Sequence, residues 1–262
     1  MAYETLSFDV SDGVARVALN RPEAANAFNI QICGDFFDAA IACDERDDIR
    51  AVVLTGEGSM FSAGGDLKFF AAQGDALGAT LKEITGLLHA GIGRMAHMDA
   101  PVVGAINGMA AGAGFSLAAA CDYGIAAKSA RFTLAYTAAG LSPDGSSTWF
   151  LPRLIGLRQA RELMLTNRML SADEALDMNI IDRVVADDAL EDEAMALAKQ
   201  FAEGPTRAYG ATKRLLQETW SSGLEVQMDR ETRSISDLTR TADAREGISA
   251  FIEKRKPDFK GE

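Results

Sequence analysis

The sequence predicts an α/β fold that is followed by a mostly helical C-terminal part. In the first half of the chain, stretches with apolar residues at helical spacing alternate with short, strongly apolar runs, a pattern typical of helices that lead into buried strands. After Gly140 the strand-like runs almost disappear and leucine-rich amphipathic stretches dominate. Repeated helix–strand alternation predicts right-handed crossovers that cover both faces of the sheet.

The N-terminal residues predict a β-hairpin. Two β-prone runs, Leu6–Val10 and Val14–Leu19, flank the sequence Ser11-Asp12-Gly13. Asp-Gly between two such runs is a frequent hairpin turn. We therefore expect the chain to open with two antiparallel strands.

Helix–strand pairs follow the hairpin. Each joins an amphipathic stretch to an apolar run, and the pairs are 29–46 with 51–55, 77–97 with 102–106, and 113–120 with 123–127. Later in the chain only Ile180–Val185 is strand-like.

Gly204-Pro205 marks an expected boundary, because proline is favoured at a helix start, and three helical stretches then extend to Phe251. The sequence thus predicts a core at 1–204 and a helical region at 205–262. Helices with apolar faces need a partner surface, either within the chain or on another subunit.

Composition and charge exclude several classes of function. The 262 residues are 48% hydrophobic, enough for a sizeable core, and 38 acidic against 26 basic residues give a formal charge of -12. This charge repels nucleic-acid phosphates and anionic lipids, so neither a nucleic acid nor a membrane is an expected partner. Three cysteines without CxxC spacing indicate neither a disulfide framework nor a zinc cluster. We expect a cytoplasmic protein, because the N-terminus lacks the basic and apolar regions of an export signal.

One uncharged stretch, Ala100 to Cys121, contains the GxxxG pattern of packed membrane helices at Gly108–Gly112. A membrane span is not favoured, because the stretch also contains a proline, Asn107 and four glycines and lies between Asp99 and Asp122. A buried strand, a glycine-rich turn and a buried helix explain it better.

Few residues are available for metal or nucleophilic catalysis. His89 and His97 are the only histidines, which leaves little for a histidine-rich metal site, and no metal is expected. Gly112-Ala-Gly114-Phe-Ser116 matches neither GxGxxG nor GxSxG, and no GxxxxGK[ST] loop occurs. Dinucleotide-binding, hydrolase and nucleotide-triphosphate functions lose their usual support.

Two glycine-rich turns remain as candidates for chemistry. Phe61–Leu67 and Asn107–Gly114 each follow a predicted strand and enter a predicted helix. Such turns can aim unpaired backbone N–H groups at one point and so hold an oxyanion. Glycine is the default residue of any tight turn, so that either turn alone would more often be structural.

With their flanking sequences, the two turns make the chain resemble the crotonase, or enoyl-CoA hydratase/isomerase, superfamily. The resemblance extends from Leu19-Asn-Arg-Pro-Glu23 and Asn26-Ala-Phe-Asn29, through both turns, to Ser249–Lys256. It implies the crotonase fold of repeated ββα units with a C-terminal helical trimerisation region, and assembly as a homotrimer or a dimer of trimers. It also implies an acyl-CoA thioester substrate, with no cofactor beyond the coenzyme A moiety of that substrate.

The resemblance assigns the oxyanion donors to the backbone N–H groups of Gly65 and Ala113. It also places coenzyme A near Ala27, Ala63 and Lys68 and near Phe251 and Lys254. The last two, in the C-terminal helical region, would contact coenzyme A bound to a neighbouring subunit.

The chain departs from the family pattern at two places. Ala113 stands where many relatives have the middle glycine of a Gly-Gly-Gly run, which leaves its N–H available. Hydratases of the family use two glutamates, and the corresponding positions here are Ser116 and Tyr136. Neither hydratase carboxylate is present.

A different carboxylate, Asp144, lies in Gly140-Leu-Ser-Pro-Asp144-Gly-Ser-Ser-Thr-Trp149, just before a predicted helix. An Asp at such a position could be an N-cap. Its place also resembles that of the catalytic Asp of family isomerases, including the ring-epoxide isomerases of phenylacetyl-CoA breakdown. A single carboxylate suits an isomerase, which removes a proton near the thioester, forms a dienolate on the oxyanion donors and returns the proton at another carbon.

Three other functions stay open. A 4-halobenzoyl-CoA dehalogenase would use an Asp at the place of Asp144 and a His at that of His89, although it has Trp where this chain has Tyr136. A hydratase with relocated acid and base groups and a non-catalytic binding protein on the same fold are the others. The residues expected in the acyl pocket are Tyr136, Ser116, Trp149 and His89, with Phe69 or Phe70 closing it.

Overall fold

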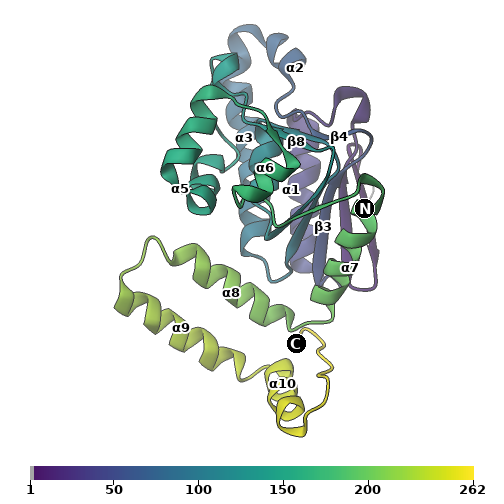
Figure 1. Cartoon of the computed structure of the whole chain (residues 1–262), viewed down its shortest axis with the longest axis vertical. Helices are drawn as coiled ribbons and strands as arrows, with labels where there is room; N and C mark the ends of the chain where they lie inside the picture. Colours follow the sequence, from purple (N-terminus) through teal and green to yellow (C-terminus); the bar gives the residue numbers. More distant parts are fainter. Residues whose placement is uncertain (1–2) are drawn as a thin grey trace.

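A computed structural model describes residues 3–262 and has two sheets surrounded by helices (Figure 1). The six-stranded sheet has the order β1-β2-β3-β5-β7-β10, and the four-stranded sheet has the order β4-β6-β8-β9. The strands are β1 (Leu6–Ser11), β2 (Val14–Leu19), β3 (Ala51–Gly56), β4 (Met60–Ser62), β5 (Val102–Ile106), β6 (Met109–Ala111), β7 (Tyr123–Ala127), β8 (Arg131–Thr133), β9 (Leu170–Ser171) and β10 (Arg183–Val185). The helices are α1 (Ile30–Glu45), α2 (Leu67–Ala71), α3 (Leu77–His97), α4 (Ala113–Ala119), α5 (Ser147–Thr166), α6 (Ala172–Asp177), α7 (Leu190–Ala202), α8 (Thr206–Glu218), α9 (Leu224–Leu238) and α10 (Ala242–Glu253). The predicted α/β class is confirmed.

The N-terminal hairpin is also confirmed. β1 pairs antiparallel with β2, from Leu6 opposite Leu19 to Ser11 opposite Val14. Asp12 and Gly13 between them have φ values of 52° and 77°. Positive φ at both central residues is what a type I′ hairpin turn requires.

The predicted helix–strand pairs are present within one residue of their expected bounds. α1 begins after Asn29, whose side chain accepts a hydrogen bond from the N–H of Ile32 at 3.1 Å. The strands β2, β3, β5 and β7 are parallel neighbours, and every residue of β3 and β5 is buried. Burial on both faces explains why these strands are uninterrupted apolar runs.

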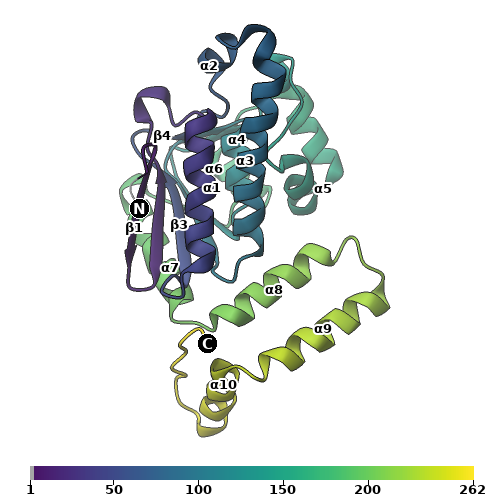
Figure 2. The same ribbon diagram turned by 180° about the vertical axis from the view of Figure 1, so that it is seen from behind.

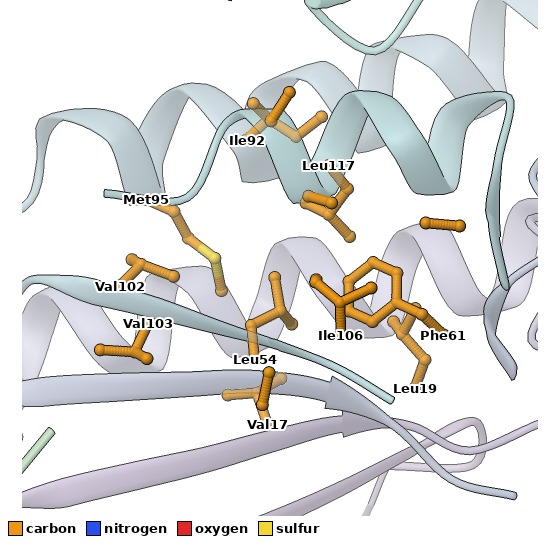
Figure 3. Close-up of a cluster of buried hydrophobic side chains, with 14 of the residues drawn as sticks. Val17, Leu19, Leu54, Phe61, Ile92, Met95, Val102, Val103, Ile106 and Leu117 are labelled. Atoms are coloured by element: carbon orange, nitrogen blue, oxygen red, sulfur yellow. The ribbon is translucent and has the colours of Figure 1, made fainter. Parts of the chain in front are cut away.

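Helices cover both faces of the six-stranded sheet. α1 and α3 pack against each other on one face, whereas α7 lies on the other face against β3 and β5 (Figures 1 and 2). Between the sheet and the helices, apolar side chains of β2, β3 and β5 meet those of α3 and α4 (Figure 3), among them Val17, Leu19, Leu54, Ile106, Ile92, Met95 and Leu117. This core holds β3 and β5, which lead through the short strands β4 and β6 into the two glycine-rich loops.

The four-stranded sheet is not predicted by the sequence pattern. Its strands have two or three residues each, too short for alternation of apolar and polar residues to be visible. β6 lies inside the segment that was expected to be one glycine-rich turn.

The prediction of a strand over Ile180–Val185 was too long, since β10 has only Arg183–Val185. Asp182 turns the chain just before it: its N–H donates to the carbonyl of Gly124, and its carboxylate accepts from the N–H of Gly124 at 2.7 Å. Ile180 and Ile181 are buried in this turn rather than paired in the sheet.

The three helices predicted after Pro205 are present, and α8 begins at Thr206. α8, α9 and α10 lie beyond one end of the six-stranded sheet, and α2 lies at the opposite end of the molecule (Figure 1). The division of the chain at residue 204 stays a prediction. Of the helices in residues 3–262, none combines the length and the apolar character needed to cross a bilayer.

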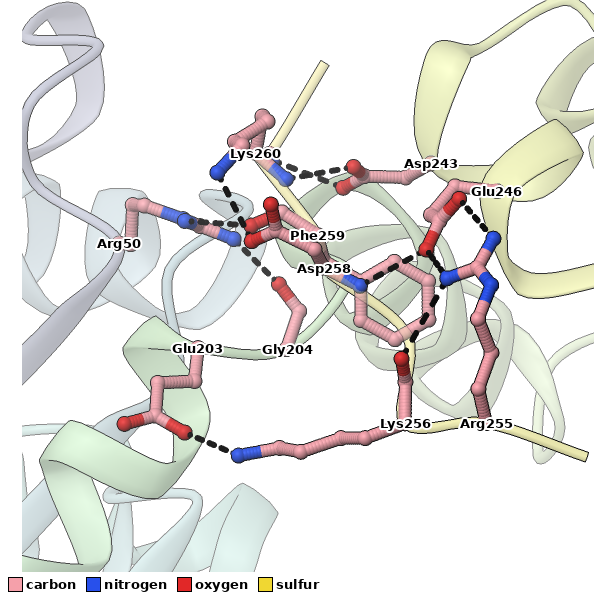
Figure 4. Close-up of polar contacts among 11 residues, drawn as sticks. Arg50, Glu203, Gly204, Asp243, Glu246, Arg255, Lys256, Asp258, Phe259 and Lys260 are labelled. Atoms are coloured by element: carbon pink, nitrogen blue, oxygen red, sulfur yellow. Dashed lines mark hydrogen bonds and ion pairs between the residues drawn. The ribbon is translucent and has the colours of Figure 1, made fainter. Parts of the chain in front are cut away.

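A polar cluster joins the C-terminal segment to the core (Figure 4). The guanidinium of Arg50 donates to the carbonyls of Gly204 at 2.6 Å and Phe259 at 3.1 Å and to the hydroxyl of Thr206 at 3.1 Å. The carboxylate of Asp243 in α10 accepts from the N–H groups of residues 260 and 261. The end of the chain therefore returns to the core.

A second junction contains a buried lysine. The ammonium of Lys213 in α8 donates to the carbonyls of Met95 at 2.9 Å and Ala100 at 3.1 Å, and it lies 2.6 Å from the carboxylate of Asp122. A buried ammonium needs such partners, because burying it unpaired is very unfavourable. Lys213 therefore attaches α8 to the ends of α3 and of β5.

Candidate active site

The two glycine-rich loops meet backbone to backbone. A Cβ atom on Gly64 would lie 2.6 Å from the carbonyl oxygen of Ala111 and 3.2 Å from the nitrogen of Ala113. Gly64 has φ 85°, and Gly112 has φ 51° with ψ -124°, conformations that favour glycine. Any other residue at Gly64 would push the loops apart.

The N–H groups of Gly65 and Ala113 are available at this meeting point. Gly65 forms a parallel bridge with Phe28 in which Phe28 donates to Gly64 and Asp66 donates to Phe28, so the N–H of Gly65 points away from Phe28. Ala113 is the first residue of α4, where N–H groups have no acceptor within the helix. Among residues 3–262, neither N–H has a protein acceptor. The pair can hold an oxyanion.

Arg21 fixes the first loop. Its guanidinium donates to the carbonyl of Ala27 at 2.6 Å and to the carboxylate of Asp66 at 3.2 Å. The same carboxylate accepts from the N–H of Phe69 at 3.0 Å and so caps α2. The direction of the Gly65 N–H is thus set by a charged pair and a helix cap.

Gly65 and Ala113 both line a cavity of about 240 Å³. Much of its wall is apolar, with contributions from α2, from α3 and from the segments before α1 and after β8: Phe28, Phe70, Leu81, Ile84, Leu88 and Leu134. Asp144 is the only carboxylate among the described residues that line it. The cavity can therefore take an apolar group next to one base.

Asp144 is held by its side chain and by its backbone. The hydroxyl of Tyr136 donates to Oδ1 of Asp144 at 2.6 Å. The carbonyl of Asp144 accepts from the hydroxyls of Ser116 and Ser147, both at 2.9 Å. No side-chain cap is present at the start of α5, whose N-cap residue is Ser146. Asp144 lines the cavity, and its carboxylate does not cap α5.

Tyr136 stays protonated beside this carboxylate. Burial, followed by the negative charge of Asp144, raises the pKa of the Tyr136 phenol well above its ordinary value. A neutral phenol keeps its O–H, which is the donor to Oδ1 of Asp144.

Ser116 lies behind the cavity wall instead of on it. Its hydroxyl contacts the hydroxyl of Tyr136 at 3.0 Å and the carbonyl of Gly112 at 3.2 Å, besides the carbonyl of Asp144. The residue is fully buried in α4. Ser116 thus supports the residues that line the cavity.

Two residues expected in the acyl pocket lie outside the cavity. Nε2 of His89 accepts a hydrogen bond from the N–H of Gly145 at 3.0 Å, and the imidazole is turned away from the cavity toward α5 and α8. Trp149 carries the guanidinium of Arg153 over its ring at 3.7 Å from the ring centroid and also does not line the cavity. The α5 helix directs Trp149 to the far side of the Asp144 loop.

The residues expected to hold coenzyme A do not all come together in one chain. Ala63 lines the cavity, Ala27 precedes the lining residue Phe28, and Lys68 is exposed on α2 next to the first loop. Phe251 and Lys254 lie on and just after α10, at the opposite end of the molecule (Figure 1).

Sequence reasoning missed the α3 wall of the cavity. Leu81, Ile84 and Leu88 have the spacing of one helical face, but the same spacing is typical of any helix that packs on a core. Phe70 was expected to close the pocket and does line it, with its ring so near Gly65 that a Cβ there would lie 2.6 Å away. Within residues 3–262, no three His, Cys, Asp or Glu side chains are grouped closely enough to hold a metal ion.

The topology, in which each glycine-rich loop leads from a short second sheet into a helix, is that of the crotonase fold. A solved structure of a putative enoyl-CoA hydratase from Streptomyces coelicolor superposes with a TM-score of 0.94 at 32% identity, over 100% of this chain and 96% of that one. A model of the enoyl-CoA hydratase/isomerase family matches residues 9–262. The chain belongs to this family of enzymes.

Two curated relatives differ in their named activity. A probable enoyl-CoA hydratase from Rhodobacter capsulatus is 40% identical over 100% of both chains. A 1,2-epoxyphenylacetyl-CoA isomerase from Escherichia coli is 39% identical over 96% of this chain and 97% of its own. Similarity at this level establishes the family and leaves the reaction to be argued from the site.

Proposed function

We propose that the protein is an acyl-CoA isomerase, which moves a double bond or rearranges a ring epoxide by proton transfer through a thioester dienolate. The observation that supports this most is that Asp144 is the single carboxylate on the described wall of the cavity shared by Gly65 and Ala113. One carboxylate is sufficient for isomerisation, because the same group can remove the proton and return it.

The proposed reaction begins with the thioester oxygen on the N–H groups of Gly65 and Ala113. Asp144 takes a proton from a carbon next to the thioester or its double bond, and the electrons of the broken C–H bond move to that oxygen. The two N–H groups stabilise the resulting dienolate. Oδ1 of Asp144 is bonded to Tyr136, whereas no donor among the described residues contacts Oδ2. We therefore assign the proton to Oδ2, from which it returns to another carbon.

A hydratase is the second candidate, because the Rhodobacter capsulatus relative bears that name. Hydration requires one group to activate water and another to manage the proton at the α-carbon. The hydroxyls of Ser116 and Tyr136 stand at the two positions in question, and each is already bonded to Asp144. These contacts favour isomerisation.

A dehalogenase-like hydrolase is less well supported. It would need His89 near the reacting acyl group, and Nε2 of His89 is bonded to the N–H of Gly145 outside the cavity.

We also propose self-assembly as a trimer or a dimer of trimers. Lys68 lies on α2, whereas Phe251 and Lys254 lie on and just after α10 at the opposite end of the molecule (Figure 1), so we infer that the latter two contact coenzyme A bound to a neighbouring subunit.

Turnover of four thioesters by the purified protein tests the proposed reaction. The substrates are a 3-enoyl-CoA, a 2-enoyl-CoA, an aryl epoxide acyl-CoA and 4-chlorobenzoyl-CoA. We expect the first or the third to be isomerised without uptake of water. Hydration of the 2-enoyl-CoA as the fastest reaction would overturn the isomerase assignment in favour of the hydratase, and chloride release would favour the dehalogenase.

A further inference from the structure

His89 lies just beyond the face of α3 that forms the cavity wall. Leu81, Ile84 and Leu88 occupy that face, and one further residue along the helix turns the side chain by about 100°. The imidazole therefore reaches the loop that carries Asp144 instead of the cavity.

The peptide bond between Asp144 and Gly145 is held at both ends. On one side the Asp144 carbonyl accepts from the hydroxyls of Ser116 and Ser147. On the other side the N–H of Gly145 donates to Nε2 of His89 at 3.0 Å. Among the described residues, His89 is the only acceptor of that N–H.

The backbone around this peptide also has a conformation that needs support from neighbouring contacts. Gly145 and Ser146 have φ values of 59° and 70°, and left-handed backbone is uncommon for a serine. A Cβ on Gly145 would lie 2.9 Å from the Cβ of Ser116, so the peptide is pressed against α4. Such backbone persists only where surrounding contacts determine it.

We infer that His89 is a positioning residue for Asp144, which acts by accepting the hydrogen bond of the Gly145 N–H and does not itself exchange protons with the substrate. The inference rests on the proposed function, because it concerns the base that this function requires. Nε2 accepts only when it carries no proton, so neutral His89 has its proton on Nδ1. Loss of the hydrogen bond would leave one end of the peptide free and displace the carboxylate from the acyl group.

The test compares His89→Leu, which cannot accept a hydrogen bond, with His89→Gln, whose amide oxygen can. Exchange of the α-protons of phenylacetyl-CoA for deuterium in D₂O is followed by NMR, and kcat and KM are obtained from initial rates. We expect His89→Leu to lower kcat about 10- to 100-fold, the range that a small displacement of a catalytic group produces, with KM within about twofold. His89→Gln should stay within about threefold of the wild type, because it restores the acceptor.

A double-mutant cycle separates positioning from direct catalysis. If His89 acts through Asp144, His89→Leu should cause no further loss in an Asp144→Asn protein. If the losses in kcat of the two single variants multiply in the double variant, or if His89→Gln is as slow as His89→Leu, His89 itself acts on the substrate. A His89→Leu protein with unchanged kcat would refute any role in positioning.

The same data distinguish the two proposals. Full exchange activity in Asp144→Asn alone overturns the proposed function, and the positioning role falls with it. An inactive Asp144→Asn protein together with a fully active His89→Leu protein overturns only the positioning role. Thermal unfolding of each variant confirms that it is folded, which the exposed position of His89 leads us to expect.

Discussion

The loops around the cavity and the C-terminal helices differ in how fully their side chains and backbone groups find partners within the chain. At the cavity, Gly64 and Gly112 bring two backbone segments into contact, and the hydroxyls and carbonyls around Asp144 find partners in the same chain. On the C-terminal helices and in the turn between α8 and α9, large apolar side chains remain exposed: Trp220 is 72%, Ile235 68% and Phe251 86% exposed. Exposed apolar side chains gathered in one region are typical of interaction surfaces.

The contrast separates two uses of the chain. The proposed reacting centre consists of backbone N–H groups and one carboxylate, all positioned by contacts that the chain makes with itself. The helical region provides apolar surface that the chain does not bury. Changes near the cavity should therefore affect stability and turnover, whereas changes on the C-terminal helices should affect association.

The largest effect is expected where the C-terminal helices join the core. Lys213→Met removes the ammonium that is bonded to Met95, Ala100 and Asp122, and breaking one partner of a buried ion pair costs about 3–5 kcal/mol. Lys199→Met is the control, because its pair with Asp12 is exposed and should contribute less than about 1 kcal/mol. Urea unfolding measures both. If both variants lose the same free energy of unfolding, the buried pair does not hold α8 to the core.

A smaller effect is expected where the two loops touch. Gly64→Ala places a Cβ against the carbonyl of Ala111 and imposes a left-handed conformation on alanine, which together should cost about 2–4 kcal/mol. Gly86→Ala in α3 is the matched control. Its Cβ has open space, so the higher helix propensity of alanine should add about 0.5–1 kcal/mol of stability. The two substitutions should therefore change the free energy of unfolding in opposite directions. A Gly64→Ala protein as stable as the wild type would contradict the close contact.

Association should respond to the exposed face of α9. Ile235→Glu puts a charge on an exposed apolar position of α9 and should weaken assembly by about 2 kcal/mol or more, as for an interface hot spot, which raises the protomer concentration at half dissociation. Sedimentation measures this shift, with Leu165→Glu on α5 as the control. A wild-type protein that is strictly monomeric at micromolar concentration would rule out the assembly, and an equal shift in both variants would remove the special role of the C-terminal helices.

The smallest of these effects concerns the partner of Asp144. Tyr136→Phe removes the hydroxyl that donates to Oδ1 at 2.6 Å, and we expect kcat to fall at least about tenfold, since one hydrogen bond to a charged group contributes about 1.5–3 kcal/mol. KM should hardly change, because the ring still fills its place in the wall. An unchanged kcat would mean that Ser116 and the backbone contacts hold Asp144 without Tyr136.

Sequence reasoning predicted the elements that have many residues and missed those that have few. α1, α3 and the parallel strands are long enough to display their period, and the Asp12-Gly13 turn has a residue-specific signature. β4, β6, β8 and β9 are held by pairing with distant segments, which a local pattern does not contain. The second sheet therefore became visible only in the structure.

The positions of the candidate site residues were predictable only in part. Gly65, Ala113 and Asp144 were identified by resemblance, and all three line one cavity in the structure. The outward orientation of His89 and Trp149 was not predictable, because a single residue along a helix decides which surface a side chain faces.

The central claim is that Asp144 moves the proton while Gly65 and Ala113 hold the thioester oxygen. Deuterium incorporation from D₂O at the α-carbon of phenylacetyl-CoA measures this step alone, in the wild type and in Asp144→Asn. We predict that the wild type exchanges the proton, and that Asp144→Asn exchanges it about 10²–10⁴-fold more slowly while it still binds the thioester, because the donors are backbone groups. Exchange by Asp144→Asn at the wild-type rate would contradict the account.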